Sequence, residues 1–359
     1  MRLPKLDDLI GEQLAVYETP PDQPLFVVGP PGSGKTSLAV FRCNYLRERE
    51  RQGVLITRNR MLSTLANQLG APAHTMHSFV STAYSQRFGH LAPEPFRYQY
   101  DWGQIVGDYT AANATPTLDH MVVDEGQNLP SGFFRWVSLF GARYATVFAD
   151  EDQTTDPQRS TMADICAASF PDPVRLTVNH RNTVQIAALA EHFHKSAVLA
   201  PGTVPAHRVG EKPRLEVVTS WGAFAEQVAL RSANRGGSIG VIVYTQEDVT
   251  RMRGLLKDCI RPGTRLDAYT SAYPQGSGRI QILQPGITVL TSESVIGLEF
   301  DTVYLQDLSR SLPCRTLDDY RRMYMLCARA REALILINGP RALTPDQLAE
   351  LPGSTILER

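Results

Sequence analysis

The sequence predicts an α/β protein with parallel sheets, and three observations indicate this fold class. Short apolar runs typical of buried strands alternate with helix-like segments on both sides of the middle of the chain. One such run, residues 25–28, leads directly into a glycine-rich octet, residues 29–36, and a helix-like stretch follows from Ser37. At 359 residues the chain is also long enough for two domains with separate hydrophobic cores.

The octet fills every fixed position of the phosphate-binding pattern G-x-x-x-x-G-K-[ST]. Its glycines let the backbone fold round a phosphate, and the amide groups at the helix N-terminus supply positive potential. Lys35 is expected to reach the β- and γ-phosphates of ATP, and the Thr36 hydroxyl to ligate Mg²⁺. The residues predicted to bind the nucleotide here are Gly29, Pro30, Pro31, Gly32, Ser33, Gly34, Lys35, Thr36 and Ser37.

Acidic and amide side chains follow two further predicted strands. The strand at residues 120–123 ends in Asp124 and Glu125. A carboxylate beside a phosphate loop can hold the Mg²⁺ shell, which we assign to Asp124, and a second one can activate water, which we assign to Glu125. The strand at residues 145–149 is followed by Gln153, which we expect to sense the γ-phosphate. Hydrolysis of ATP is therefore predicted, rather than binding alone.

The composition is that of an ordinary globular enzyme. The net charge is −1, so binding to nucleic acid would need a local basic patch. The five cysteines are scattered without a C-x-x-C pair, which favours a reducing compartment over a disulfide framework or a zinc site. No signal-peptide pattern and no membrane-length apolar run is present, so we expect a cytoplasmic protein without a membrane partner.

The order of the motifs resembles that of superfamily 1A helicases of the UvrD/Rep type, and the resemblance extends over nearly the whole chain. Beyond the phosphate loop, the matching segments are residues 11–13 (the adenine-reading Q motif), 54–59 (motif Ia), 75–79 (T-x-H-S-F), 124–128 (motif II), 149–153 (motif III), 179–182 (motif IV), 297–301 (motif V) and 324–331 (motif VI). The resemblance implies two tandem RecA-like P-loop NTPase domains, which we place at residues 1–173 and 174–359. It also implies ATP as substrate, Mg²⁺ as cofactor and single-stranded nucleic acid as partner.

The family implies a role for each matched position. Gln13 would read the adenine edge, His180 would stack on the base in place of the usual tyrosine, and Glu299 would contact the ribose. Gln153 would contact the γ-phosphate.

Arg181 and Arg329 would be arginine fingers supplied by the second domain. Guanidinium groups match the charge that spreads over the oxygens of a transferring phosphoryl group. Arg329, however, lies in an arginine-rich stretch, residues 321–331, that we predict to be a helix, and arginines on such a helix are commonly solvated. Both readings of Arg329 stay open at this point.

The chain departs from the family where accessory domains are usual. The stretches between residues 77 and 124 and between residues 181 and 297 are too short for the 1B and 2B domains, so we predict a minimal form. The first stretch carries a group of aromatic residues interleaved with Arg97. They could stack on unpaired bases or could belong to a packed loop or hairpin; these residues are Phe96, Tyr98, Tyr100 and Trp102.

Positions that usually touch nucleic acid in the family also differ. Residues 154–159, after motif III, contain no aromatic residue, and Ile56 in motif Ia stands where an aromatic one is usual. In the part of motif V that precedes its core at residues 297–301, Glu293 and Ile296 stand where His and Lys are typical. Each change is expected to weaken base stacking or phosphate attraction.

Two hypotheses follow from this uneven pattern. The first is an ATPase that translocates on or unwinds single-stranded nucleic acid, a UvrD-like DNA helicase, with RNA as the open alternative to DNA. The second is an ATP-driven switch without unwinding activity. It would control a partner protein, such as a nuclease in DNA repair or antiviral defence.

Overall fold

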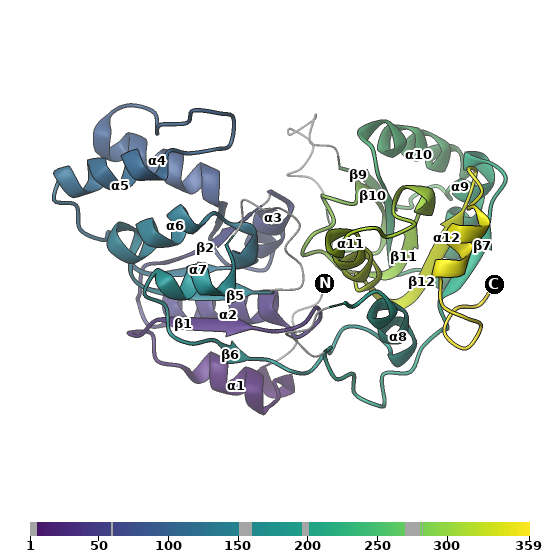
Figure 1. Ribbon diagram of the computed structural model, residues 1–359, viewed down its shortest axis with the longest axis horizontal. Coiled ribbons are helices and arrows are strands. Elements are labelled where there is room, and N and C mark those ends of the chain that lie inside the picture. The colour runs from purple at the N-terminus through teal and green to yellow at the C-terminus, as the bar shows by residue number, and fades with distance from the viewer. Residues whose placement is uncertain (1–5, 59, 151–159, 196–200, 270–280, 282) are drawn as a thin grey trace. The chain divides into compact units, whose positions relative to one another are not determined.

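The computed structural model describes residues 6–58, 60–150, 160–195, 201–269, 281 and 283–359, which form two compact units (Figure 1). The N-terminal unit holds the described residues up to Pro30 and Gly34–Thr177, and the C-terminal unit holds Pro31–Ser33 and Val178–Arg359. Each unit is built on one six-stranded sheet flanked by helices. The predicted α/β class is confirmed, and the architecture is consistent with two tandem RecA-like domains.

The N-terminal sheet has the strand order β3-β2-β4-β5-β1-β6, and all its strands run parallel. The strands are β1 (Leu25–Val28), β2 (Gly53–Thr57), β3 (Ala73–Thr75), β4 (Leu118–Val123), β5 (Ala142–Ala149) and β6 (Val174–Arg175). The helices are α1 (Gly11–Glu18), α2 (Lys35–Glu48), α3 (Arg60–Gln68), α4 (Met76–Phe88), α5 (Trp102–Ala111), α6 (Ser131–Trp136) and α7 (Met162–Ala167), with short 3-10 turns at Leu6–Asp8 and Gly126–Asn128 and a π-helical turn at Val137–Gly141.

Strand β1 is buried on both faces, which explains why its sequence is apolar at every position instead of alternating. Phe26 and Val28 join a core that includes buried residues of α4, α5, α6 and α7, whereas Leu25 and Val27 join a core that includes buried residues of α1, α2 and α3. Parallel sheets are covered on both faces, so their central strands are apolar at every position. The carboxyl end of β1 is thereby fixed within the unit, and the phosphate loop begins there.

The C-terminal sheet has the order β7-β12-β11-β8-β10-β9, again with all strands parallel. Its strands are β7 (Arg214–Val217), β8 (Ser238–Val243), β9 (Leu266–Ala268), β10 (Gly286–Thr291), β11 (Phe300–Leu305) and β12 (Ala330–Asn338). Its helices are α8 (Val184–His192), α9 (Trp221–Arg235), α10 (Gln246–Cys259), α11 (Leu317–Cys327) and α12 (Pro345–Glu350), with a 3-10 turn at Leu308–Arg310. Helices α9 and α10 contribute Phe224, Val228, Val249 and Met252 to a core with the strands.

The compact units divide slightly later than the boundary drawn from the sequence. The segment at Val174–Arg175 pairs with β1 as strand β6 and so belongs to the N-terminal sheet. The division therefore falls between Thr177 and Val178, rather than after residue 173.

The helix predicted across residues 321–331 is wrong at its C-terminal end. Helix α11 ends at Cys327, and Ala330 already pairs with Phe300 as the first residue of β12. The aliphatic run at residues 333–337 favours a strand and is buried in the sheet, which overrides the helical preference of the arginines before it. Arg329 consequently lies in the connection between helix and strand.

Within the described ranges, none of the helices combines the length and the apolar character needed to cross a membrane.

Candidate nucleotide-binding site

The phosphate loop connects the carboxyl end of β1 to the first residue of α2. Gly32 and Gly34 have φ angles of +83° and +90°, a region that L side chains rarely adopt. Gly34 caps α2 without any side-chain hydrogen bond, so the amides of the first turn are left for a ligand. A β-carbon at Gly34 would lie 2.7 Å from Nε2 of Gln13, a buried residue of α1. The predicted adenine reader therefore sits directly against this loop.

Lys35 is buried and turned toward the loop that precedes it. Its Nζ donates hydrogen bonds to the carbonyl oxygens of Gly29 (2.5 Å) and Pro30 (2.9 Å). It also forms an ion pair of 3.5 Å with Oδ2 of Asp150, the residue after β5. The sequence did not single out Asp150; its place follows from the pairing of Val28 with Ala149 in neighbouring parallel strands.

The carboxylates after β4 are buried side by side. Asp124 accepts a hydrogen bond at Oδ1 from the Glu125 amide (3.0 Å). Burial and the Glu125 carboxylate raise the pKa of Asp124 to about 7, although the Thr36 hydroxyl and Lys35 act in the opposite direction. The Thr36 hydroxyl and the Asp124 carboxylate therefore interact, and their shared role at a metal stays a prediction.

Glu125 is held by a clamp of amide side chains. Its Oε2 accepts hydrogen bonds from Nε2 of Gln127 (2.7 Å) and Nδ2 of Asn128 (3.1 Å). Oε1 of Gln127 in turn accepts the Asp150 amide (3.0 Å), so one glutamine links the ends of β4 and β5. The backbone of Glu125 has a φ of +56°, uncommon for a residue with a side chain. Such outliers cluster at functional sites, where the surroundings hold them in place.

The donor set fits a magnesium ion that is bound together with a nucleotide. Mg²⁺ commonly takes one or two protein oxygens and completes its shell with phosphates and water. Thr36 and Asp124 offer such oxygens, and Oδ2 of Asp124 is buried with no hydrogen bond of good geometry to a described residue. No set of three or more His, Cys, Asp or Glu that could hold a metal occurs in the described part of the chain.

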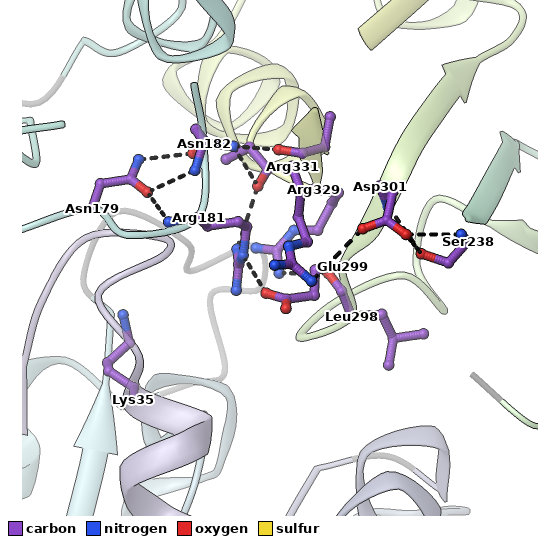
Figure 2. A network of polar contacts seen from close by, with 12 residues as sticks. Lys35, Asn179, Arg181, Asn182, Ser238, Leu298, Glu299, Asp301, Arg329 and Arg331 are labelled. Carbon is purple, nitrogen blue, oxygen red and sulfur yellow. Dashed lines mark hydrogen bonds and ion pairs between the residues drawn. The ribbon is translucent and has the colours of Figure 1, made fainter. Parts of the chain in front are cut away.

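The C-terminal unit gathers the remaining predicted residues round one ion pair. Arg181 donates from Nε to Oε2 of Glu299 (2.6 Å) and from Nη1 to the Ala328 carbonyl (3.3 Å). Burial alone would raise the pKa of Glu299, but nearby positive charge, with the Arg181 guanidinium as its largest contributor, lowers that pKa. Figure 2 shows this network of polar contacts.

Arg329 is only 1% exposed, so the solvated reading of this residue is wrong. Its Nε donates to the Met325 carbonyl (3.0 Å) and its Nη1 to the Leu298 carbonyl (3.4 Å). Asn182 holds the backbone on both sides of Arg329, because Nδ2 of Asn182 donates to the carbonyls of Ala328 (3.2 Å) and Ala330 (2.6 Å).

Asn179 orders the turn that carries Arg181. Its Nδ2 donates to Oδ1 of Asn182 (2.7 Å), and its Oδ1 accepts the amide of Arg181 (3.0 Å) (Figure 2). His180, the predicted base-stacking residue, lies half-buried in the same turn. Both asparagines lie within the segment that resembles motif IV, residues 179–182, but the sequence predicts no role for either.

The structure thus brings the predicted residues together in two groups, one in each unit. Gln153 lies outside the described residues. The first group comprises Gln13, Gly29, Pro30, Lys35, Thr36, Ser37, Asp124 and Glu125, with Gly34 between them, and the second comprises His180, Arg181, Glu299 and Arg329; Pro31, Gly32 and Ser33, at the tip of the phosphate loop, count with the C-terminal unit.

Comparison with known proteins bears on the first group. Residues 12–157 match the family model described as an AAA domain. This match and the loop geometry both support a nucleotide-binding domain of the P-loop NTPase type in this segment. No curated protein matches the chain.

Two solved helicase structures resemble the fold. One is the C-terminal domain of a possible DNA helicase from Lactobacillus plantarum WCFS1, with 20% identity and a TM-score of 0.36, covering 50% of this chain and 98% of that one. The other is the PRRSV helicase, with 14% identity and a TM-score of 0.42, covering 95% of this chain. The present chain spans 57% of the length of that second protein.

Proposed function

We propose that this protein is a Mg²⁺-dependent ATPase whose general base is the Glu125 carboxylate. The observation that carries the proposal is the convergence of Lys35, Thr36, Asp124 and Glu125 at the carboxyl ends of β1 and β4, which share one parallel sheet. Ligands of open α/β sheets bind at this edge. Thr36 and Asp124 would hold Mg²⁺, which supplies charge stabilisation for the transferring phosphoryl group.

The remaining side chains have complementary roles in this proposal. Lys35 would exchange the carbonyls of its own loop for phosphate oxygens. Glu125 would orient and deprotonate the attacking water, with its carboxylate fixed by Gln127 and Asn128. Arg181 and Arg329 would stabilise the charge on the transferring group as arginine fingers. Gln13, His180 and Glu299 would hold the adenine, the base face and the ribose.

ATP hydrolysis would be coupled to single-stranded nucleic acid, DNA ahead of RNA, as in UvrD-like helicases. The support for this finer statement is the ordered series of segments that resembles the family's motifs along nearly the whole chain. Movement along a strand would follow from a conformational cycle driven by nucleotide binding and release.

The decisive test is the variant Glu125→Gln. Turnover of ATP should fall by at least about 100-fold, because the general base is removed, while nucleotide binding is retained. Steady-state hydrolysis and binding of a fluorescent ATP analogue are the two readouts. Glu18→Gln, an exposed glutamate at the end of α1, serves as the matched control and should behave as wild type. Undiminished turnover in Glu125→Gln would contradict the assignment.

A second candidate function is an ATP-driven switch that controls a partner such as a nuclease in DNA repair or antiviral defence. One observation favours it: Glu293, where the family has a histidine, is exposed just after β10 and would repel a phosphate backbone. Hydrolysis measured at low salt with and without a single-stranded oligonucleotide separates the two. Strong stimulation supports the motor, and indifference to both DNA and RNA supports the switch.

A further inference from the structure

The segment between α4 and α5 divides its aromatic residues into two classes. Tyr100 and Trp102 pack inward: their rings lie 5.7 Å apart, and Trp102 lies 6.0 Å from Phe133 of the core. Phe96 and Tyr98, in contrast, are 71% and 62% exposed. Figure 1 shows this segment as a loop that connects the two helices. The packed-loop reading of the sequence therefore holds for one pair only, and we call residues 96–98 the aromatic tip.

The aromatic tip is a structured turn rather than a loose loop. The Gln99 amide donates to the Phe96 carbonyl (2.8 Å), which closes the turn. The Tyr98 amide donates to the Glu94 carboxylate, and Tyr98 has a φ of +65°, which costs on the order of 1 kcal/mol for a residue with a side chain. A fold that keeps this conformation fixes the backbone of the tip and the Tyr98 ring before any partner arrives, which lowers the entropic cost of binding.

His77, the second residue of α4, anchors the tip to the sheet. The rings of Tyr98 and Tyr100 lie 5.3 Å and 5.2 Å from the His77 ring, and the Tyr100 hydroxyl donates to the His77 carbonyl (3.0 Å). Helix α4 starts immediately after β3, so His77 lies at the carboxyl end of that strand. Because the strands are parallel, the tip is fixed at the same edge of the sheet as the phosphate loop and Asp124.

The chemistry of the tip suits a planar, negatively charged polymer. The Arg97 guanidinium lies over the Tyr98 ring, 5.0 Å from its centre, and donates to the Tyr98 hydroxyl (3.2 Å). Two exposed rings and a cation are therefore offered within three consecutive residues. Burial lowers the pKa of His77; the Glu94 carboxylate raises it and the Arg58 guanidinium, just after β2, lowers it, so a carboxylate and a second cation both belong to this edge.

We infer that the aromatic tip is a stacking platform for the unpaired bases of single-stranded nucleic acid. It takes the place of the aromatic residues that are missing after motif III and at Ile56, which is fully buried in β2 and unable to stack on anything outside the core. Phe96 receives a base face, and Arg97, held over the Tyr98 ring, pairs with the backbone. This inference rests on the proposed nucleic-acid-dependent function.

The test measures the affinity for a fluorescent oligo(dT), and in parallel for oligo(rU), by anisotropy without ATP. Phe96→Ala and Tyr98→Ala are each expected to weaken binding about tenfold. Phe96→Tyr should retain binding, whereas Phe96→Leu, which keeps an apolar side chain but loses the ring, should weaken it. Leu91→Ala, which removes a side chain that is 79% exposed in the same segment, is the matched control and should bind as wild type.

Photocrosslinking of an iodouracil-containing oligonucleotide gives a second, direct readout. The crosslink is expected on Phe96 or Tyr98, as identified by mass spectrometry. Equal affinity of wild type and both alanine variants, tight binding by Phe96→Leu, or a crosslink confined to other segments would overturn the inference. Because binding is measured without ATP, these outcomes are independent of the Glu125→Gln hydrolysis test, so the platform and the ATPase can fail separately.

Discussion

The buried carboxylates of the two groups of candidate site residues differ in the direction in which their surroundings shift their pKa values. In the N-terminal unit, Asp124 and Glu125 lie together, and the pKa of Asp124 is raised to about 7. In the C-terminal unit, Glu299 faces Arg181 at 2.6 Å, and its pKa is lowered. The Asp124–Glu125 pair has too little positive charge nearby to offset its burial, so it suits a cation that arrives with a ligand. The second group has its cation already, so its arginines are held in position by the protein itself.

The largest expected effect concerns the arginine side of this comparison. Arg181→Ala should lower kcat by about 1,000-fold, because a guanidinium at the transferring phosphoryl group contributes rate factors of this order. Arg181→Lys should restore little, since lysine lacks the planar fork. Single-turnover hydrolysis is the measurement, and Arg315→Ala, at an exposed arginine just before α11, is the control. If kcat in Arg181→Ala stayed near wild type, Arg181 would have only its structural contact with Glu299.

Removal of the acid from the C-terminal pair should destabilise the protein. Glu299→Gln leaves the Arg181 guanidinium without its carboxylate, at a cost of about 2–3 kcal/mol in the free energy of unfolding for a pair that is largely buried. Since the folded-state pKa of Glu299 is lowered, its contribution is present above the unfolded pKa and is lost as the pH falls through the folded value. Urea unfolding at pH 7 and near pH 4 should therefore show the larger difference from wild type at pH 7.

Asp124→Asn should stabilise the folded protein, whereas Glu299→Gln should destabilise it. The folded-state pKa of Asp124 is raised to about 7 from 3.8, so ionisation disfavours the fold as the pH rises through this window. Without Mg²⁺ or nucleotide, the asparagine variant should be more stable than wild type at pH 8, by on the order of 1 kcal/mol or more, and nearly equal to it at pH 4. The same variant should lose Mg²⁺-dependent ATP hydrolysis. If the variant were less stable than wild type at pH 8, the ionised Asp124 carboxylate would not destabilise the fold, and the raised pKa would be contradicted.

The smallest expected effect tests the amide clamp. Gln127→Met keeps the volume but removes the hydrogen bond to Glu125 and the one from the Asp150 amide. A hydrogen bond to a charged group contributes roughly 1.5 kcal/mol or more, so kcat should fall about tenfold while KM for ATP changes little. An unchanged kcat would mean that Asn128 alone positions the carboxylate.

Local patterns in the sequence predicted what depends on local chemistry. The apolar runs predicted most of the strands because a parallel sheet buries both faces, and Gly32 and Gly34 occupy backbone conformations that only glycine adopts freely. Asp150 and Gln127 were missed because their importance depends on strand order: β5 lies between β1 and β4, and no local pattern reports that neighbour relation.

The sequence also could not predict which of the candidate side chains are exposed to solvent. Phe96, Tyr98, Tyr100 and Trp102 have the same spacing and the same chemical type, yet two of them pack inward and two face solvent. The burial of Arg329 depends on β12 starting at Ala330, a tertiary effect that an arginine-rich sequence does not disclose.

The hydrogen bonds of Lys35 have a kinetic consequence. Its ammonium group is engaged by the Gly29 and Pro30 carbonyls and by the Asp150 carboxylate, so a phosphate that binds Lys35 would have to displace at least one of these contacts. If ATP binds Lys35 as proposed, its capture would proceed in two stages: an encounter whose rate rises with ATP concentration, followed by a rearrangement of fixed rate within the protein. At high ATP concentration the observed rate of capture should level off, and Lys35 would act as the latch that sets this ceiling.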